Sequence, residues 1–288
     1  MSRIEETDNI SEWVEAATTP DNLEFRQAVH TILQGISLQQ DLRVCMVLKG
    51  GILMAIRYKS RRFTKDIDVS TSYSLADLDQ DAVSRQLNDG FALATEILDY
   101  GVACAVQRLT IQPKGVKNPS YPSMSIKIGY AYQGTPKHRR LMNGQSPTVI
   151  GIDYSLNEEL PNPESLKILN GDELLAYSLI DLVAEKLRSL LQQESRNRYR
   201  RQDIFDLHLV LTGIANFDDE DRGQILASLM TKARSRDIEP HMDSLDNEEL
   251  RRRAEHEYHT LADDTEGELP VFSEAYEVVR EFYRSLPW

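Results

Sequence analysis

The first part of the chain carries both helical and strand-like hydrophobic patterns. Between residues 22 and 36 the apolar residues are spaced so that they would share one face of a helix with 3.6 residues per turn. This spacing predicts a helix, and Asp21 is predicted as its N-cap. Similar reasoning predicts helices over 52–58 and 82–98. Strands are predicted over 44–48, 66–71, 105–111, 124–132 and 148–154. The last two strands flank a polar stretch that contains glycine, 134–146, and are expected to form a hairpin.

From residue 172 onward the pattern is helical only. The predicted helices span 172–193, 203–211, 222–233, 248–261 and 273–286, with no strand among them. Strands mixed with helices first and helices alone afterwards indicate an α+β fold followed by an all-helical C-terminal region. Residues 157–170 are rich in turn formers, so we predict two domains, 1–160 and 161–288.

Composition excludes several classes of protein. Hydrophobic residues make up 41% and charged residues 27%, which is typical of a soluble globular chain and not of a disordered one. No run approaches the roughly 18 apolar residues of a membrane span, and residues 1–6 do not resemble a secretory signal. Cys45 and Cys104 are too few for a disulfide framework, so we expect buried thiols in a reducing cytoplasm.

Charge is unevenly distributed along the chain. The 33 Lys and Arg residues against 46 Asp and Glu give a net charge of −13, which argues against a protein that coats nucleic acid. Residues 42–65, however, carry seven bases and no acid, and residues 186–201 carry six bases and one acid. These two segments predict local positive fields that attract an anionic ligand, although a solvated surface is the alternative.

A pair of glycines separates the first predicted strand from the helix that follows. Lys49 is followed by Gly50 and Gly51, and the helical pattern starts at once. Glycine lets a ligand approach the backbone, and the N–H groups of a first helical turn favour a phosphate. The spacing is not that of a Walker loop, and a tight turn without a ligand would explain the same pair.

Two acids lie two residues apart in the next predicted strand. Asp66 and Asp68 should project from one face with Ile67 buried behind them. Like charges this close raise each other's pKa unless a cation lies between them. Oxygen-only sites of this kind suit Mg²⁺ or Mn²⁺, whereas an exposed strand edge with two solvated acids is the alternative.

A third acid lies inside an apolar run. Strand alternation puts Asp153 on one face with Val149 and Gly151, opposite Ile150, Ile152 and Tyr154. An acid in such a run needs a partner or a metal if it is desolvated. A strand end at which Asp153 caps the turn 155–157 would explain the position equally well.

Charged residues also fall on apolar faces of the predicted helices. Lys186 has leucines at i−4 and i+4, so its side chain either snorkels to solvent or reaches an anion. Asp203 and Asp206 likewise have Leu207 and Val210 as i+4 neighbours. Acids on an inner helix face need a cation such as Lys186 or a nearby arginine, and a purely structural ion pair is one explanation.

Three segments together point to a family. The first is K-G-G-x₅-R-x₅-F-[ST]-x-D-I-D from Lys49 to Asp68, and the second is A-E-K-L-R-x-L from Ala184 to Leu190. The third is anchored at Arg196 and ends in Q-D-I-F-D-L at Leu207. In this order the segments resemble the nucleotidyl transferase AbiEii/AbiGii toxin family, part of the DNA-polymerase-β-like nucleotidyltransferase superfamily.

The resemblance implies an α+β nucleotidyltransferase fold and a role for each residue above. It implies metal binding by Asp66, Asp68 and Asp153, and catalytic roles for these three together with Lys186, Asp203 and Asp206. It implies nucleotide binding by Lys49, Gly50, Gly51, Thr64 and Lys186. The basic segments suggest RNA binding by Arg57, Arg61, Arg62, Arg196, Arg198 and Arg201.

The resemblance also implies a reaction. It is the transfer of a nucleoside monophosphate from an NTP to an acceptor hydroxyl, with Mg²⁺ or Mn²⁺ as cofactor and the 3′ end of an RNA, tRNA in particular, as acceptor. The protein would be the toxin of a type IV toxin–antitoxin or phage-defence system with a cognate antitoxin. The alternatives are a kinase or protein-nucleotidylating enzyme of the same fold, and a non-catalytic binding relative.

Overall fold

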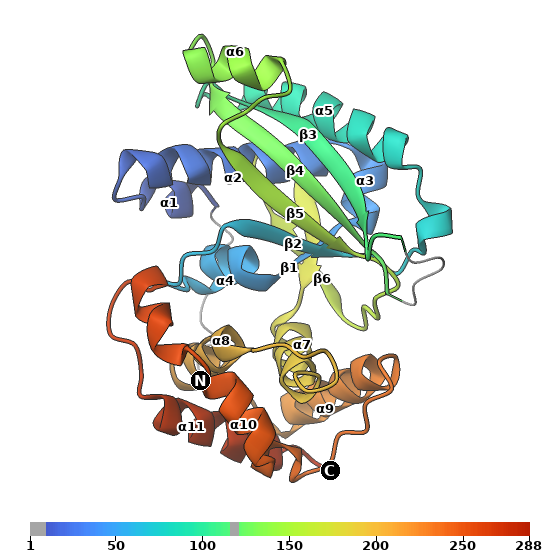
Figure 1. Cartoon of the computed structure of the whole chain (residues 1–288), viewed down its shortest axis with the longest axis vertical. Coiled ribbons are helices and arrows are strands. Elements are labelled where there is room, and N and C mark those ends of the chain that lie inside the picture. Colours follow the sequence, from blue (N-terminus) through green and yellow to red (C-terminus); the bar gives the residue numbers. More distant parts are fainter. Residues whose placement is uncertain (1–9, 116–120) are drawn as a thin grey trace.

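The computed structural model describes residues 10–115 and 121–288 and contains one mixed seven-stranded sheet (Figure 1). The strands are β1 (Val47–Lys49), β2 (Asp66–Ser70), β3 (Val102–Gln112), β4 (Ser123–Tyr132), β5 (Val149–Ser155), β6 (Pro163–Lys167) and β7 (Glu173–Tyr177). Their order across the sheet is β3-β4-β5-β2-β1-β7-β6. The α+β fold class predicted from the sequence is confirmed.

Helices precede, interrupt and follow the strands. Those before β6 are α1 (Ile10–Glu15), α2 (Pro20–Ser37), α3 (Gln40–Cys45), α4 (Gly50–Tyr58), α5 (Gln80–Ile97) and α6 (Pro136–Met142). Those after β7 are α7 (Leu179–Leu191), α8 (Arg201–Leu209), α9 (Asp219–Arg234), α10 (Glu248–Glu255) and α11 (Phe272–Arg284). Short 3₁₀ or π turns are η1 (Leu75–Asp77), η2 (Val210–Ile214), η3 (Ser244–Asp246) and η4 (Tyr258–Asp264). No helix of the described residues is long and apolar enough to cross a membrane.

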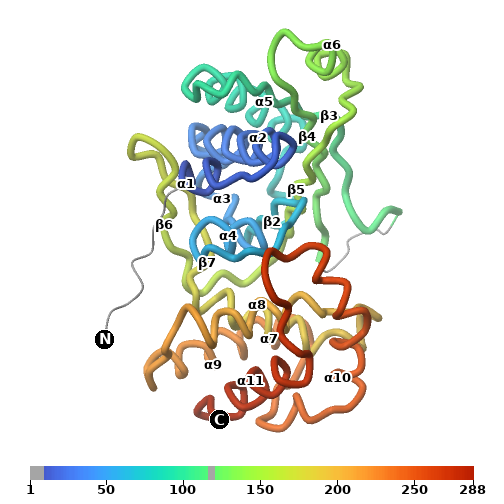
Figure 2. Tube along the Cα trace, turned by 90° about the vertical axis from the view of Figure 1, so that its left-hand side faces the viewer, coloured from blue at the N-terminus to red at the C-terminus, as the bar shows by residue number. Residues whose placement is uncertain are grey.

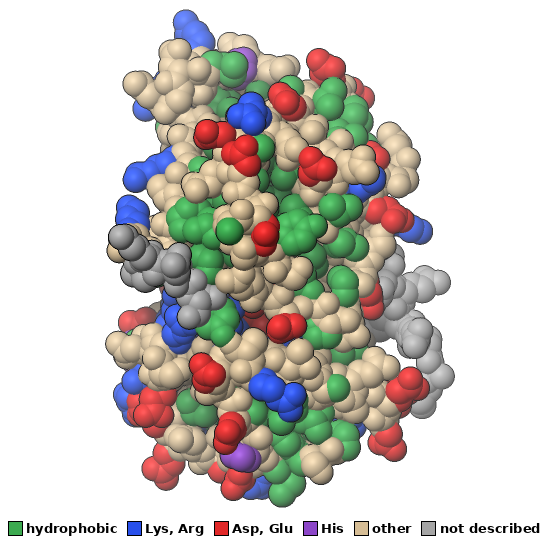
Figure 3. All heavy atoms as spheres, turned by 90° about the vertical axis from the view of Figure 1, so that its right-hand side faces the viewer, with side chains coloured by type: hydrophobic (Ala, Val, Ile, Leu, Met, Phe, Trp, Pro, Cys, Tyr) green, Lys and Arg blue, Asp and Glu red, His purple; other side chains and the backbone are tan. Residues whose placement is uncertain are grey.

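Helices cover one face of the sheet, and a separate group of helices lies beyond one end of the sheet. Helices α2 and α5 pack on each other and contact β3, and α2 also reaches β4 (Figures 1 and 2). Helices α7 to α11 gather together beyond the sheet (Figure 2). Acidic side chains are spread over both halves of the face drawn in Figure 3. The negative net charge is therefore not confined to one end of that face.

The first long helix forms where its apolar stripe predicts it. Helix α2 buries Val29, Ile32 and Leu33 completely. Its N-cap is Thr19, whose hydroxyl accepts a hydrogen bond from the N–H of Asn22 at 3.2 Å. The prediction of Asp21 as the cap is wrong, because Pro20 is already the first helical residue and Asp21 lies within the first turn.

The strand predicted over 44–48 is wrong in its first half. Residues up to Cys45 belong to α3, and β1 holds only Val47–Lys49. A short run of apolar residues has no distinctive period, so a buried helix end and a buried strand look alike in sequence. Strand β1 is short because α4 begins immediately after it.

The prediction of helices alone after residue 171 is also wrong. Strand β7 pairs in parallel with β1 through Leu48 and Ala176, and β6 pairs with β7 in antiparallel fashion. Helix α7 begins only after Ser178, whose hydroxyl caps the N–H of Asp181 at 3.1 Å. Two strands of the sheet thus lie beyond residue 160, the predicted domain boundary.

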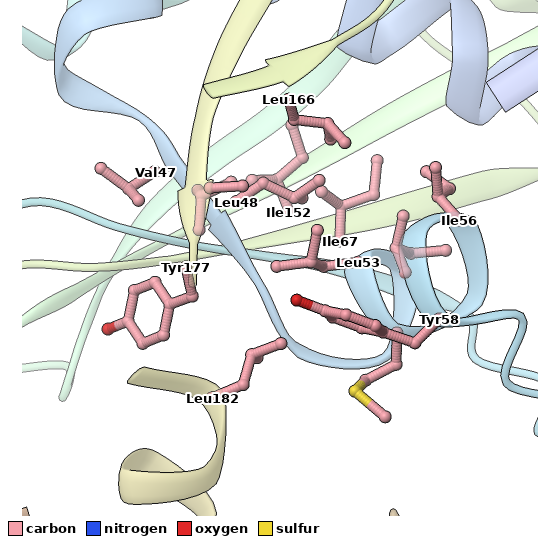
Figure 4. Close-up of a cluster of buried hydrophobic side chains, with 14 of the residues drawn as sticks. Val47, Leu48, Leu53, Ile56, Tyr58, Ile67, Ile152, Leu166, Tyr177 and Leu182 are labelled. Carbon is pink, nitrogen blue, oxygen red and sulfur yellow. The ribbon is translucent and has the colours of Figure 1, made fainter. Parts of the chain in front are cut away.

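One hydrophobic core joins the sheet to the helical region. Figure 4 shows Leu48 of β1, Ile67 of β2 and Ile152 of β5 together with Leu53 of α4 and Leu182 of α7. All five side chains are buried. Because α7 packs on the same core as the central strands, polar residues of α7 are held at a fixed position relative to the sheet.

Candidate active site

A polar cleft lies between the central strands and the helical region. Its volume is about 400 Å³, and it is lined by residues of β1, α4, β2 and β5 on one side and of α7 and α8 on the other. Of the predicted residues, the cleft brings together Lys49, Gly50, Gly51, Arg62, Thr64, Asp66, Asp68, Asp153, Lys186, Arg196, Arg198 and Asp203. The three sequence segments that carry the resemblance therefore meet in space.

The strand register places the carboxylates side by side. In β2 and β5, which are parallel, Asp68 pairs with Asp153 and Asp66 pairs with Gly151. On the other flank of β2, Asp68 pairs with Lys49 of β1. Paired residues of a sheet share a face, so Lys49, Asp68 and Asp153 form one row across three strands. Ile67, between the two acids of β2, is buried as predicted.

Asp153 lies in the middle of its strand and faces solvent. The alternation predicted for this run is confirmed, since Ile150, Ile152 and Tyr154 are buried and Asp153 is exposed. Asp153 pairs with Ser125 of β4 as well as with Asp68, so the alternative of a strand-end cap is wrong. Because its side chain is exposed, it does not need a partner to offset desolvation.

At the glycine pair, cleft side chains lie very close to the backbone. Gly50 has φ +73°, and a Cβ built on it would lie 2.1 Å from Oδ2 of Asp68. A Cβ on Gly51 would lie 2.9 Å from the side chain of Thr64. A side chain at either position would therefore displace a cleft residue, and at Gly50 the left-handed backbone favours glycine independently. Both glycines therefore allow Asp68 and Thr64 to pack directly against the first turn of α4 beside the cleft.

The two carboxylates of β2 point towards different neighbours. Asp68 lies against Gly50, whereas Oδ1 of Asp66 lies 2.3 Å from the position of a Cβ on Gly151, beside Nζ of Lys127. Accordingly, within residues 10–115 and 121–288 no group of three or more His, Cys, Asp or Glu is arranged to hold a metal ion. Asp66, Asp68 and Asp153 fit a magnesium site by residue type and by strand register. Asp66 would have to turn towards Asp68 to complete it.

The pKa of Asp68 is strongly perturbed by its surroundings. Burial raises its pKa most, and the neighbouring Asp153 and Asp66 raise it further, while Lys49 and Lys186 lower it, so that the pKa is about 6. The prediction that neighbouring acids raise one another's pKa is thus confirmed for Asp68. Lys49 donates a hydrogen bond to Oγ of Ser155 at 3.3 Å.

Three buried charged side chains and the partly buried Arg62 form a cluster on the opposite wall. Nζ of Lys186 lies 3.1 Å from Oδ1 of Asp203 and 2.7 Å from Oδ2 of Asp206. Arg62 donates through Nε and Nη2 to the two oxygens of Asp206, at 3.1 and 3.0 Å. The prediction that the inner-face acids of α8 need Lys186 or an arginine is confirmed. Burial alone would raise the pKa of Asp206, but Lys186 and Arg62 lower it to about 2.

Sequence reasoning missed a second charged network in the cleft. Arg188 donates to Glu185 of the same helix at 2.5 Å, and Arg236 of the turn after α9 pairs with Glu158 at 2.5 Å. The guanidinium of Arg236 lies 3.5 Å from the ring centroid of Tyr121. The spacing of Glu185 and Arg188 by three residues was the available signal, whereas Arg236 and Tyr121 meet only through the fold.

The predicted RNA-binding arginines do not form one surface. Arg57 is buried, donating to Glu164 at 3.1 Å and to the carbonyl of Ser165, so its assignment to RNA is wrong. Arg62 lines the cleft but is bound to Asp206, and Arg61 lines a separate pocket of about 550 Å³. Arg201 pairs with Glu257 at 3.3 Å and does not line the cleft. Of the predicted arginines, Arg196 and Arg198 also line the cleft, together with Arg200, which was not predicted.

Comparison with known proteins connects this geometry to a family. The model of the family "Nucleotidyl transferase AbiEii toxin, Type IV TA system" matches residues 31–278. A crystal structure of a candidate nucleotidyltransferase from H. pylori is similar, with TM-score 0.50 and 12% identity, covering 93% of this chain and 95% of that one. No curated protein matches the sequence.

Two further solved structures are similar over most of their length. JHP933 from Helicobacter pylori has TM-score 0.49 and 13% identity, with 94% of this chain and 93% of that chain covered. MenT4, a nucleotidyltransferase toxin from Mycobacterium tuberculosis, has TM-score 0.48 and 15% identity, with 95% and 87% covered.

Proposed function

Because the chain belongs to the AbiEii nucleotidyl transferase toxin family of type IV toxin–antitoxin systems, we propose that it transfers a nucleoside monophosphate from an NTP to the 3′ hydroxyl of an RNA, with tRNA as the first acceptor to test. The main support is the row of Lys49, Asp68 and Asp153, which faces Lys186 across the cleft. Beside the glycine turn, this row offers acids that can hold a metal ion and a lysine that can neutralise phosphate charge, and a nucleoside triphosphate needs both.

The glycine turn and the cations around it would hold the triphosphate. Helix α4 has nine residues, and its first turn, Gly50 and Gly51, borders the cleft beside Asp68 and Thr64. N–H groups at a helix start carry partial positive charge and favour phosphate oxygens. Lys49 and Lys186 add full charges on the two sides of the cleft. These groups position the phosphates and neutralise their charge, which is most of what phosphoryl-type transfer needs from a protein.

A divalent metal would be held by Asp68 and Asp153, with Asp66 joining them. When bound, Mg²⁺ or Mn²⁺ would neutralise phosphate charge and lower the pKa of the attacking hydroxyl. The raised pKa of Asp68 is consistent with an anionic site that a cation would stabilise. We therefore expect wild-type protein to gain thermal stability on addition of Mg²⁺, by mass action on the folded state.

In the reaction, the acceptor oxygen forms a bond to the α-phosphorus as the bond from that phosphorus to the β-bridging oxygen breaks. Pyrophosphate departs with the electron pair of the broken bond. The proton of the acceptor hydroxyl passes to Asp153, which is exposed to the cleft, or to water beside it. Lys186 lies on the opposite wall, where its charge can stabilise the departing pyrophosphate.

The acceptor would approach along the arginines at one end of the cleft. Arg196, Arg198 and Arg200 line it and follow one another closely in the chain. Each cation that contacts a phosphate releases counter-ions, so acceptor affinity should fall as salt rises. The remaining protein is acidic, so binding should be limited to this strip rather than general.

Labelled nucleotides test the proposal directly. Wild-type protein is incubated with bulk tRNA, Mg²⁺ or Mn²⁺ and each NTP, labelled at either the α- or the γ-phosphate. Nucleotidyl transfer leaves the α label on RNA, and we expect Asp68→Asn to abolish it. Asp89→Asn, the same chemical change at an exposed position of α5, is the matched control and should retain transfer.

Each other result identifies a different function. Transfer of the γ label would indicate a kinase, and α label on protein would indicate protein nucleotidylation. Absence of label from every NTP and acceptor, with folded wild-type protein, would refute the proposed transfer. Because the family is that of a toxin with a cognate antitoxin, expression of wild type should arrest growth, and expression of Asp68→Asn should not.

A further inference from the structure

The charged cluster on the helical wall has two acids with different surroundings. Asp206 is completely buried and does not line the cleft. Both of its oxygens are occupied, since Oδ1 accepts from Arg62 and Oδ2 accepts from both Arg62 and Lys186. Complete burial and three charge-assisted hydrogen bonds within the protein keep this carboxylate from contacting a substrate in the cleft.

Asp203, one turn earlier on the same helix, is buried but borders the cleft. Its side chain is 8% exposed and lines the cleft. Oδ1 accepts from Lys186, but the buried Oδ2 has no hydrogen-bond partner among the described residues, and Nε of Arg200 lies 4.0 Å from it. Buried acceptors are nearly always satisfied, so an unsatisfied one beside a cleft points to a donor that arrives with a ligand.

Asp206 also offsets the repulsion between two neighbouring cations. Arg62 and Lys186 are both positive: burial and the charge of Arg62 act to lower the pKa of Lys186, and Asp206 and Asp203 outweigh them and raise it. Both cations bond to the same oxygen of Asp206, at 3.0 and 2.7 Å. Without that shared anion the two would repel each other, and the flexible lysine would keep only Asp203 as a partner.

We propose that Asp206 is a positioning residue that holds Arg62 and Lys186 together as one cation pair for the substrate triphosphate, and that Asp203 is the acid of this cluster that meets the substrate. Arg62 thereby moves from the candidate RNA-binding set to the nucleotide site. This inference rests on the proposed nucleotidyl transfer, because it assigns roles within the same cleft.

Two matched variants separate the roles. Asp203→Asn and Asp206→Asn each remove one carboxylate charge from α8, three residues apart. Binding of inorganic triphosphate, with and without Mg²⁺, is measured by calorimetry well below the melting temperature, and transfer rates are measured with α-labelled NTP. Asp206→Asn should raise the Kd for triphosphate about tenfold or more, since the cation pair is lost. Asp203→Asn should change that Kd less than about twofold yet slow transfer at least tenfold.

A double-mutant cycle shows whether Asp206 acts through Arg62. If it does, Arg62→Gln and Asp206→Asn are strongly non-additive, and the double variant binds triphosphate within about twofold of the weaker single variant. A merely structural role for Asp206 would lower the melting temperature while leaving the Kd of folded protein unchanged. That result, or weakened triphosphate binding in Asp203→Asn, would overturn the proposal.

Failure of the proposed function is separable from failure of this inference. If wild type binds triphosphate and the variants behave as expected but no RNA is labelled, the acceptor assignment fails and the assignment of Asp206 and Arg62 stands. If wild type binds no triphosphate under either condition, both are refuted.

Discussion

Substitution of Gly50 by alanine tests the central geometry of the cleft. The new methyl group would lie 2.1 Å from Oδ2 of Asp68, whereas real Cβ contacts essentially never fall below 3.0 Å. The carboxylate must therefore move by at least 3.0 − 2.1 = 0.9 Å, or the turn must change. In addition, φ at Gly50 is +73°, a conformation that disfavours any residue with a Cβ.

The two effects predict different magnitudes for stability and activity. A left-handed backbone costs alanine about 1–2 kcal/mol of unfolding free energy. Displacing a reacting or metal-binding group by about 1 Å can cost on the order of 100-fold in rate. We therefore expect Gly50→Ala to fold, to lose modest stability, and to lose about 100-fold in the rate of nucleotidyl transfer.

Gly144→Ala is the matched control for this substitution. Gly144 has φ +70°, close to that of Gly50, but no heavy atom lies within 4 Å of its added Cβ. Denaturant unfolding should show a similar loss for both variants from the backbone term alone, while transfer by Gly144→Ala stays within about twofold of wild type. Equal transfer rates for the two variants would refute the idea that contact between Gly50 and Asp68 fixes the site.

Two further predictions concern charge. Because burial raises the pKa of Asp68 to about 6, the native state binds more protons than the unfolded state between about pH 4 and 6, so stability contributed by this group falls as pH rises through that window. Thermal unfolding in chelator should show Asp68→Asn to be more stable than wild type above pH 6, and identical pH profiles would contradict this. Arg57→Gln should destabilise the protein yet leave RNA affinity unchanged, whereas Arg198→Gln should weaken RNA binding and reduce the salt slope by about one. If filter binding showed a smaller dependence of RNA affinity on salt for Arg57→Gln than for wild type, Arg57 would be a phosphate contact after all.

Long helices and strands were predictable because each buries one face, which gives its apolar residues a regular spacing in the sequence. Helices α2 and α5 and strands β4 and β5 formed within a few residues of their predicted bounds. The alternation of Gly151, Ile152 and Asp153 likewise fixed which side chains face the cleft. Boundaries were less predictable where apolar runs were short, as in residues 44–48 and at β7, since neither shows a period of its own.

The pairings among charged residues were only partly predictable. Acids on the inner face of α8 signalled a need for a cation, and Lys186 was a correct partner. The choice between buried Arg57 and cleft-lining Arg198 was not visible, because both belong to strongly basic segments. Which arginine is solvated depends on contacts such as that of Arg57 with Glu164, which is 107 residues away in the chain.

The amino-acid sequence by itself determined which side chains share a face of a strand or helix, because those periods follow from local backbone geometry. It also determined the family, through three segments whose residue types and order are distinctive. Only the tertiary structure decided that Asp68 lies between Lys49 and Asp153, and that Asp206 turns away from the cleft while Asp203 faces it. Strand order and helix docking bring together residues distant in the chain, whereas local periodicity specifies only which face of its own element a side chain is on.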